Sequence, residues 1–113
     1  MESKELAKIA VAAIEDKKGE NVRVIDISEV SVIADYFIIA NGTNKSQIQA
    51  IADNVEEQLY RQANAHPINI EGYREAGWIL LDFEEVIIHI FSEENREFYN
   101  LERLWRDGKQ VEL

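Results

Sequence analysis

The chain contains one stretch that decides its fold, Gly77-Trp78-Ile79-Leu80-Leu81-Asp82-Phe83-Glu84-Glu85-Val86-Ile87-Ile88-His89-Ile90-Phe91. Its two apolar runs are rich in β-branched and aromatic residues, and a short acidic turn separates them, which predicts a β-hairpin. Neither run alternates simply between polar and apolar residues. Strands of this kind lie in the middle of a sheet, where both faces are covered.

A loop of two or four residues centred on Glu84-Glu85 sets the hairpin register, because it pairs Phe83 with Val86 and Trp78 with Phe91. One face of the hairpin is then wholly apolar and is expected to be core: it carries Ile79, Leu81, Phe83, Val86, Ile88 and Ile90. The second face carries Trp78, Leu80, Asp82, Ile87, His89 and Phe91. Since a sealed core rarely tolerates two ionisable groups, we expect the second face to be partly open and to recognise a partner.

Helices and strands on either side of the hairpin are predicted from periodicity and capping. Amphipathic helices are expected over residues 3–17 and 43–64, with Asn44 as an N-cap of the second and Gly19 as a left-handed end of the first. A third helix, capped by Ser92, is expected to run to Asp107-Gly108. Its predicted buried stripe is Phe98, Leu101, Leu104 and Trp105. Strands are expected over residues 21–28, 36–40 and 68–71. This order predicts a single α/β domain with a mixed sheet of about five strands flanked by helices.

Composition narrows the classes of partner. The 113 residues carry 22 acidic against 12 basic side chains, a formal charge of −10, without a basic cluster. Nucleic acids and anionic membranes both require a positive surface, so neither is an expected partner, whereas a basic protein surface is favoured. Acidity that serves solubility alone is the alternative. The lack of cysteine excludes thiolate chemistry and disulfides. No signal-peptide pattern or membrane-length apolar run is seen, so a cytosolic protein is expected.

Catalytic patterns are sparse. His66 and His89 are far apart, and no metal-binding helix motif, nucleophile elbow or phosphate-binding glycine loop is present. Asp82 and Glu84 form a carboxylate pair that would suit a divalent ion in nucleotidyl transfer, although a solvated acidic turn is the simpler interpretation. We therefore expect neither a metal nor a cofactor.

Trp78 has two interpretations. Tryptophan is usually a core residue, but it is also enriched among the residues that dominate binding energy. Its neighbours on the second hairpin face leave both possibilities open.

The residues as an ordered set resemble one known family, the ribosomal silencing factors (Iojap-like proteins). The resemblance covers nearly the whole chain and rests on Asp35-Tyr36-Phe37-Ile38-Ile39, Gly42-Thr43, Gln49-Ala50-Ile51-Ala52, Glu71-Gly72, Gly77-Trp78, Asp82, Val86, His89-Ile90-Phe91, Arg96, Phe98-Tyr99, Leu101-Glu102 and Leu104-Trp105. It implies one ribosomal silencing factor domain over residues 1–113, with a sheet like that of the nucleotidyltransferases but without their catalytic carboxylates. The enzymes place a Gly-Ser turn shortly before their acidic pair, whereas Gly42-Thr43 lies far from Asp82 here.

The resemblance also implies a function. Family members are not enzymes; they bind the large ribosomal subunit through its fourteenth ribosomal protein, block joining of the small subunit and repress translation when nutrients are scarce. They also form homodimers. On this basis the expected contact patch consists of Trp78, Leu80, Asp82, Ile87, His89 and Phe91, bordered by Arg96 and Tyr99. A metal-dependent nucleotidyltransferase using Asp82 and Glu84 is the alternative.

Overall fold

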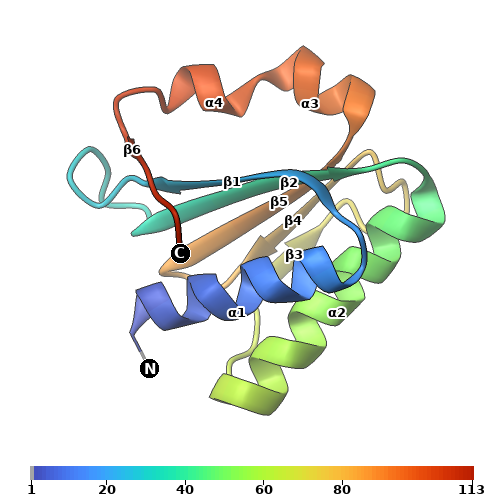
Figure 1. The fold of residues 1–113 in the computed structure, drawn as a ribbon, viewed down its shortest axis with the longest axis horizontal. Coiled ribbons are helices and arrows are strands. Elements are labelled where there is room, and N and C mark those ends of the chain that lie inside the picture. The colour runs from blue at the N-terminus through green and yellow to red at the C-terminus, as the bar shows by residue number, and fades with distance from the viewer. Residues whose placement is uncertain (1) are drawn as a thin grey trace.

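A mixed sheet separates two layers of helices in the computed structural model, which describes residues 2–113 and leaves Met1 outside (Figure 1). The elements in chain order are α1 (Ser3–Asp16), β1 (Glu20–Asp26), β2 (Tyr36–Gly42), α2 (Lys45–Ala63), β3 (Asn69–Glu71), β4 (Trp78–Asp82), β5 (Val86–Ser92), α3 (Glu93–Tyr99), α4 (Leu101–Leu104) and β6 (Lys109–Gln110). In Figure 1, α1 and α2 lie below the sheet and α3 and α4 lie above it. The predicted α/β class is therefore confirmed.

The sheet has six strands within residues 2–113, in the order β3-β4-β5-β2-β1-β6. Only β2 and β5 pair in parallel; the other neighbours are antiparallel. The prediction of about five strands was too low, because the polar tail adds β6 to the edge of β1. There the Val111 N–H donates to the Val24 carbonyl at 3.0 Å. Both side chains of β6 are exposed, so apolar periodicity gave no sign of this strand.

The hairpin register is confirmed. Trp78 pairs with Phe91 and Asp82 with Ile87, and the Phe83 N–H donates to the Val86 carbonyl at 3.0 Å. Asp82 helps to close the turn, because its Oδ1 accepts the Glu84 N–H at 2.8 Å. Glu84 has a φ of 73°, so the turn needs a left-handed residue that glutamate rarely supplies.

The wholly apolar hairpin face is core, as expected. All six of its side chains are buried against the apolar stripes of α1 and α2, together with Ile38 of β2. The two helices are joined where Asn44 Oδ1 accepts the Gln47 N–H at 2.8 Å. The Gln47 side chain in turn donates to the Lys17 and Lys18 carbonyls at 3.2 and 3.0 Å. Lys18, with a φ of 66°, takes the left-handed position that was expected of Gly19.

The last predicted helix is interrupted, which corrects its expected buried stripe. Asn100 adopts a left-handed φ of 45° and separates α3 from the single turn of α4. The break rotates the following residues relative to the preceding ones. Leu101 is buried, whereas Phe98 is 78% exposed and Leu104 is also exposed. Asparagine tolerates the left-handed region better than most residues, and this was the available signal.

No helix among residues 2–113 combines the length and apolar character needed to cross a membrane.

Replacing Ile88 by alanine is expected to lower the free energy of unfolding by about 2–4 kcal/mol, because the side chain is fully buried at the centre of β5. The matched control is Ile68→Ala, at a position 67% exposed, where a change below about 0.5 kcal/mol is expected. Urea unfolding of both variants measures the difference. Equal losses would contradict the assignment of β5 as the centre of the core.

Candidate docking surface

Trp78 begins β4 at the margin of the α3–α4 layer, and its indole is half-buried. Its ring centroid lies 5.1 Å from that of Phe91 and 4.7 Å from that of Tyr99. Its Nε1–H donates to His89 Nδ1 at 3.0 Å. Two aromatic contacts and one hydrogen bond therefore fix the orientation of a ring that still reaches solvent.

His89 is more deeply buried than the indole of Trp78. The imidazole is 3% exposed and packs 4.9 Å, centroid to centroid, from Phe37. Burial lowers the pKa of His89 from its ordinary value of 6.5 to about 4, so the ring is neutral at pH 7. Since Nδ1 accepts the indole proton, the proton of His89 resides on Nε2, for which the described residues provide no hydrogen-bond partner.

The residues of the expected contact patch differ in burial between the two strands. Trp78, Leu80 and Asp82 on β4 are half-buried and reach the surface. Ile87, His89 and Phe91 on β5 are buried, because α3 packs over β5 and β2 and Leu101 of α4 packs into the same apolar cluster. The second hairpin face is therefore open along β4 and closed along β5. The sequence could not reveal this division, because it depends on which strands the α3–α4 segment covers in the folded chain.

Arg96, expected at the border of the patch, forms a set of hydrogen bonds that we call the Arg96 clamp. Its Nε and Nη2 donate to the two carboxylate oxygens of Glu102 at 3.1 and 3.2 Å, and its Nη1 donates to Asn41 Oδ1 at 2.8 Å and to the Asn21 carbonyl. Asn21 has a φ of 51° beside an irregularity in the β1–β2 register. The guanidinium thereby connects α3 and α4 to the edge of the sheet.

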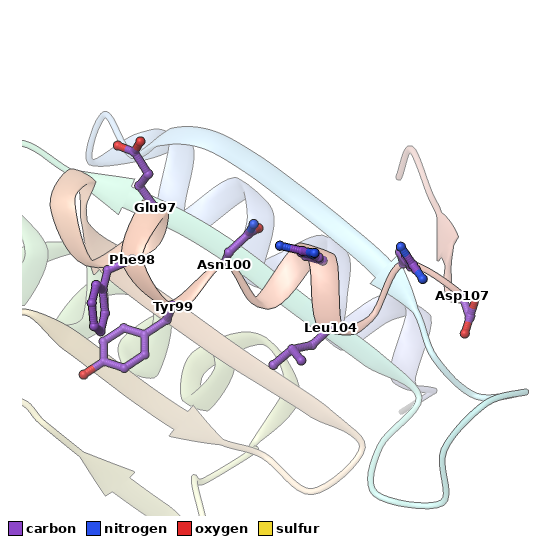
Figure 2. A pocket seen from close by; sticks show the side chains of 8 residues that line it. Glu97, Phe98, Tyr99, Asn100, Leu104 and Asp107 are labelled. Atoms are coloured by element: carbon purple, nitrogen blue, oxygen red, sulfur yellow. The ribbon is translucent and has the colours of Figure 1, made fainter.

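Exposed apolar side chains on α3 and α4 extend the surface beyond the expected residues. Phe98 packs edge-on against Tyr99 at 5.0 Å, and Tyr99 contacts Trp78. Figure 2 shows Phe98, Tyr99 and Leu104 pointing to the same side of these helices, whereas Glu97 points away. A hollow of about 690 Å³ lined by these residues borders the patch. We call the set Trp78, Leu80, Phe98 and Tyr99 the β4–α3 surface.

The carboxylates considered for metal chemistry do not assemble a centre. Asp82 accepts the Glu84 N–H in the turn, and Glu84 lies exposed at the hairpin tip. Among residues 2–113, no three His, Cys, Asp or Glu side chains are grouped so as to hold a metal ion.

Acidification is expected to destabilise the fold through His89. In the unfolded chain the imidazole takes up a proton near pH 6.5, whereas in the fold it stays neutral down to about pH 4. The stability that the fold gains with a neutral His89 is thus fully present above pH 6.5. As the pH falls toward 4, the free energy of unfolding decreases by about 3 kcal/mol at most. Urea unfolding between pH 7 and 4 should show a shallower pH dependence for His89→Phe than for the wild type. His66→Phe, at an exposed position, should retain the wild-type profile. A wild-type profile for His89→Phe would contradict the expectation.

Removing the Arg96 clamp is expected to loosen α3 and α4. In Arg96→Met, amide hydrogen exchange over residues 93–105 should accelerate at least tenfold, because a guanidinium side chain 11% exposed loses all its hydrogen bonds. Arg61→Met removes the same charge from an exposed pair with Glu57 and should leave exchange in this segment unchanged. Mass-spectrometric exchange measures both variants. Unchanged protection in Arg96→Met would show that the clamp is dispensable.

Comparisons with known proteins agree on one family. The family model described as "Ribosomal silencing factor during starvation" matches residues 1–113. Curated ribosomal silencing factors from Halalkalibacterium halodurans and Bacillus subtilis are 40% and 39% identical; each match spans 100% of this chain, and 96% and 95% of those proteins. The chloroplastic protein Iojap of Arabidopsis thaliana is 34% identical over 96% of this chain but only 43% of its own length.

Solved structures give the same result for the fold. A crystal structure of a Chromobacterium violaceum protein superposes with a TM-score of 0.90 at 30% identity, covering 100% of this chain and 92% of that one. One from Bacillus halodurans gives 0.86 at 37% identity, covering 98% and 100%. Both the family expected from the sequence and its translation-repressing role are confirmed, and membership excludes the enzymatic alternative, because the family is non-catalytic. The chain belongs to the ribosomal silencing factors, the regulators that block the joining of the ribosomal subunits.

Proposed function

We propose that this protein docks on the large ribosomal subunit through its β4–α3 surface, with Trp78 as the anchor. The observation that carries the proposal is an indole held by His89 and Tyr99 that nevertheless reaches solvent at the start of β4. A large aromatic ring fixed in one orientation loses little conformational entropy on binding. Trp78 therefore suits the centre of an interface better than a mobile side chain would.

The partner we propose is a basic ribosomal protein, the fourteenth of the large subunit, on the face that meets the small subunit. The formal charge of −10 supports a basic protein and disfavours direct binding to ribosomal RNA. The open surface combines apolar rings with Asp82, and this composition suits a protein interface with an apolar centre and a charged rim.

In this proposal, binding alone is sufficient for silencing, and no catalysed reaction is needed. A rigid body measuring 34 × 32 × 23 Å on the joining face occupies the volume that the small subunit would enter. In this proposal Trp78, Leu80, Phe98 and Tyr99 make the contacts, and Asp82 lies at their rim. Ile87, His89 and Phe91 support them from below, and Arg96 holds α3 in place.

Several finer points stay proposals. The chain acts as one domain in the cytoplasm, and it represses translation under nutrient limitation. The cytoplasmic location is supported by bacterial relatives matched over nearly their full length, while the chloroplastic relative is matched over less than half. A homodimer is compatible with docking if its contact leaves Trp78 free. The likeness to nucleotidyltransferases is supported by the mixed sheet and its parallel β2–β5 pair, with Asp82 engaged in a turn.

Trp78→Ala is expected to weaken co-sedimentation with isolated large subunits at least 100-fold, because the anchor and its stacking on Tyr99 are both lost. Small subunits added afterwards should then join normally. Tyr99→Ala, at an exposed position, should weaken binding about tenfold without disturbing the hydrogen bond of Trp78.

The matched control is Tyr60→Ala on α2, an equally aromatic and exposed site in the opposite helical layer, which should bind as the wild type does. Thermal unfolding of each variant separates loss of binding from loss of fold. Normal co-sedimentation of folded Trp78→Ala would refute the site.

A further inference from the structure

The loop between β1 and β2 carries exposed apolar side chains that the β4–α3 surface does not use. Val30, Val32 and Ile33 all point to solvent, and Val32 has a relative exposure of 105%, as much as in an extended peptide. Three aliphatic residues within four positions of a surface loop are thus largely exposed in the described chain. Such runs are unfavourable on a free surface unless they serve an interaction.

The loop is nevertheless ordered by its own hydrogen bonds. The N–H groups of Val30 and Ser31 donate to the Ile27 carbonyl at 3.0 and 2.9 Å, and the Ile33 N–H donates to Ser31 Oγ at 3.0 Å. β-Branched side chains have few rotamers to lose. The loop thus presents a preformed apolar knob, which lowers the entropic cost of inserting it into a pocket.

Carboxylates surround the base of this knob. The Asp35 N–H donates to the Glu85 carbonyl at 2.8 Å, which places the end of the loop against the β4–β5 turn. Asp35, Glu85 and Glu2 line a hollow of about 590 Å³ in which Lys4 is the only basic residue, and the exposed Glu84 is adjacent in the same turn. Glu29, within the loop, pairs with Lys109 at 3.1 Å.

This charge pattern selects one kind of partner. Phosphates of RNA or lipid headgroups are repelled by the acidic rim. A symmetric contact with a second copy would bring the same acidic rim against itself, which is also unfavourable. An apolar pocket rimmed by lysine or arginine on another protein complements both the knob and its charges.

The knob is remote from Trp78. In the sheet register, Trp78 lies level with Phe91, whereas the loop leads into Tyr36, level with Val86. Five residues along β5 correspond to about 17 Å. Figure 1 shows the β1–β2 loop projecting from one end of the sheet, beyond the helical layers. One rigid domain can therefore engage two separate points on its target.

We propose that the Val30–Ile33 knob is a second docking point, which inserts into an apolar, basic-rimmed pocket of a protein of the large ribosomal subunit. The proposal rests on the proposed function and adds a contact to it. Two contacts made by one rigid body reinforce each other, because the second forms without a further loss of translational freedom.

Photo-crosslinking tests the partner. A benzophenone amino acid placed at Val32 should crosslink to a ribosomal protein when the full chain is mixed with isolated large subunits. The same group at Tyr60 on α2 is the control and should remain uncrosslinked. Crosslinks from position 32 to ribosomal RNA only, crosslinks to a second copy of this chain, or the absence of crosslinks would each overturn the proposal.

Affinities of variants for the large subunit distinguish the proposed knob contact from the proposed docking through Trp78. The double variant Val32→Asp, Ile33→Asp should weaken large-subunit binding at least tenfold, whereas Gln62→Asp, at an exposed position on α2, should change it less than twofold. Wild-type affinity of the double variant, with binding lost in Trp78→Ala, would overturn only the knob. Failure of the wild-type chain to bind large subunits would overturn both.

Discussion

Burial of β5 on both faces is the constraint on which the rest of the structure depends. Every residue from Val86 to Phe91 is buried, and the strand has hydrogen-bonded neighbours on both sides, β4 and β2. A strand apolar on both faces has no side for water, so each face requires a cover. The long helices α1 and α2 cover one face, and the short segment α3–α4 covers the other. The unequal size of these covers leaves the proposed docking surface partly open.

Because α3 packs mainly over β5 and β2 and meets β4 through the contact of Tyr99 with Trp78, the outward face of β4 stays partly open. Trp78 lies at this boundary, where it contacts Phe91 and Tyr99 and still reaches solvent. Contacts between aromatic rings continue from the core to the surface, through Phe37, His89, Trp78, Tyr99 and Phe98. The proposed anchor, Trp78, is thus held in place by contacts that continue into the core, and it stays accessible because the helical cover over it is narrow. A binding protein without catalytic groups depends on both properties.

His89 illustrates how a buried polar group serves such a surface. The neutral imidazole accepts the indole proton at the cost of an unpartnered Nε2. An apolar side chain would remove that cost but would leave the indole without a fixed partner. Arg96 contributes in a related way, since its clamp on Glu102, Asn41 and the Asn21 carbonyl holds α3 where Tyr99 meets Trp78.

The sequence by itself determined the hairpin register, the apolar core face, the cap at Ser92 and the family, because these depend on the order and periodicity of neighbouring residues. It did not determine β6, whose two side chains are exposed and carry no apolar pattern, or the left-handed Asn100 that splits the last helix next to the exposed Phe98. Above all, it could not separate Trp78 from His89, which share one face of the hairpin. Only the tertiary structure decided which of them is surface and which is support, because the distinction depends on how far α3 extends across the sheet.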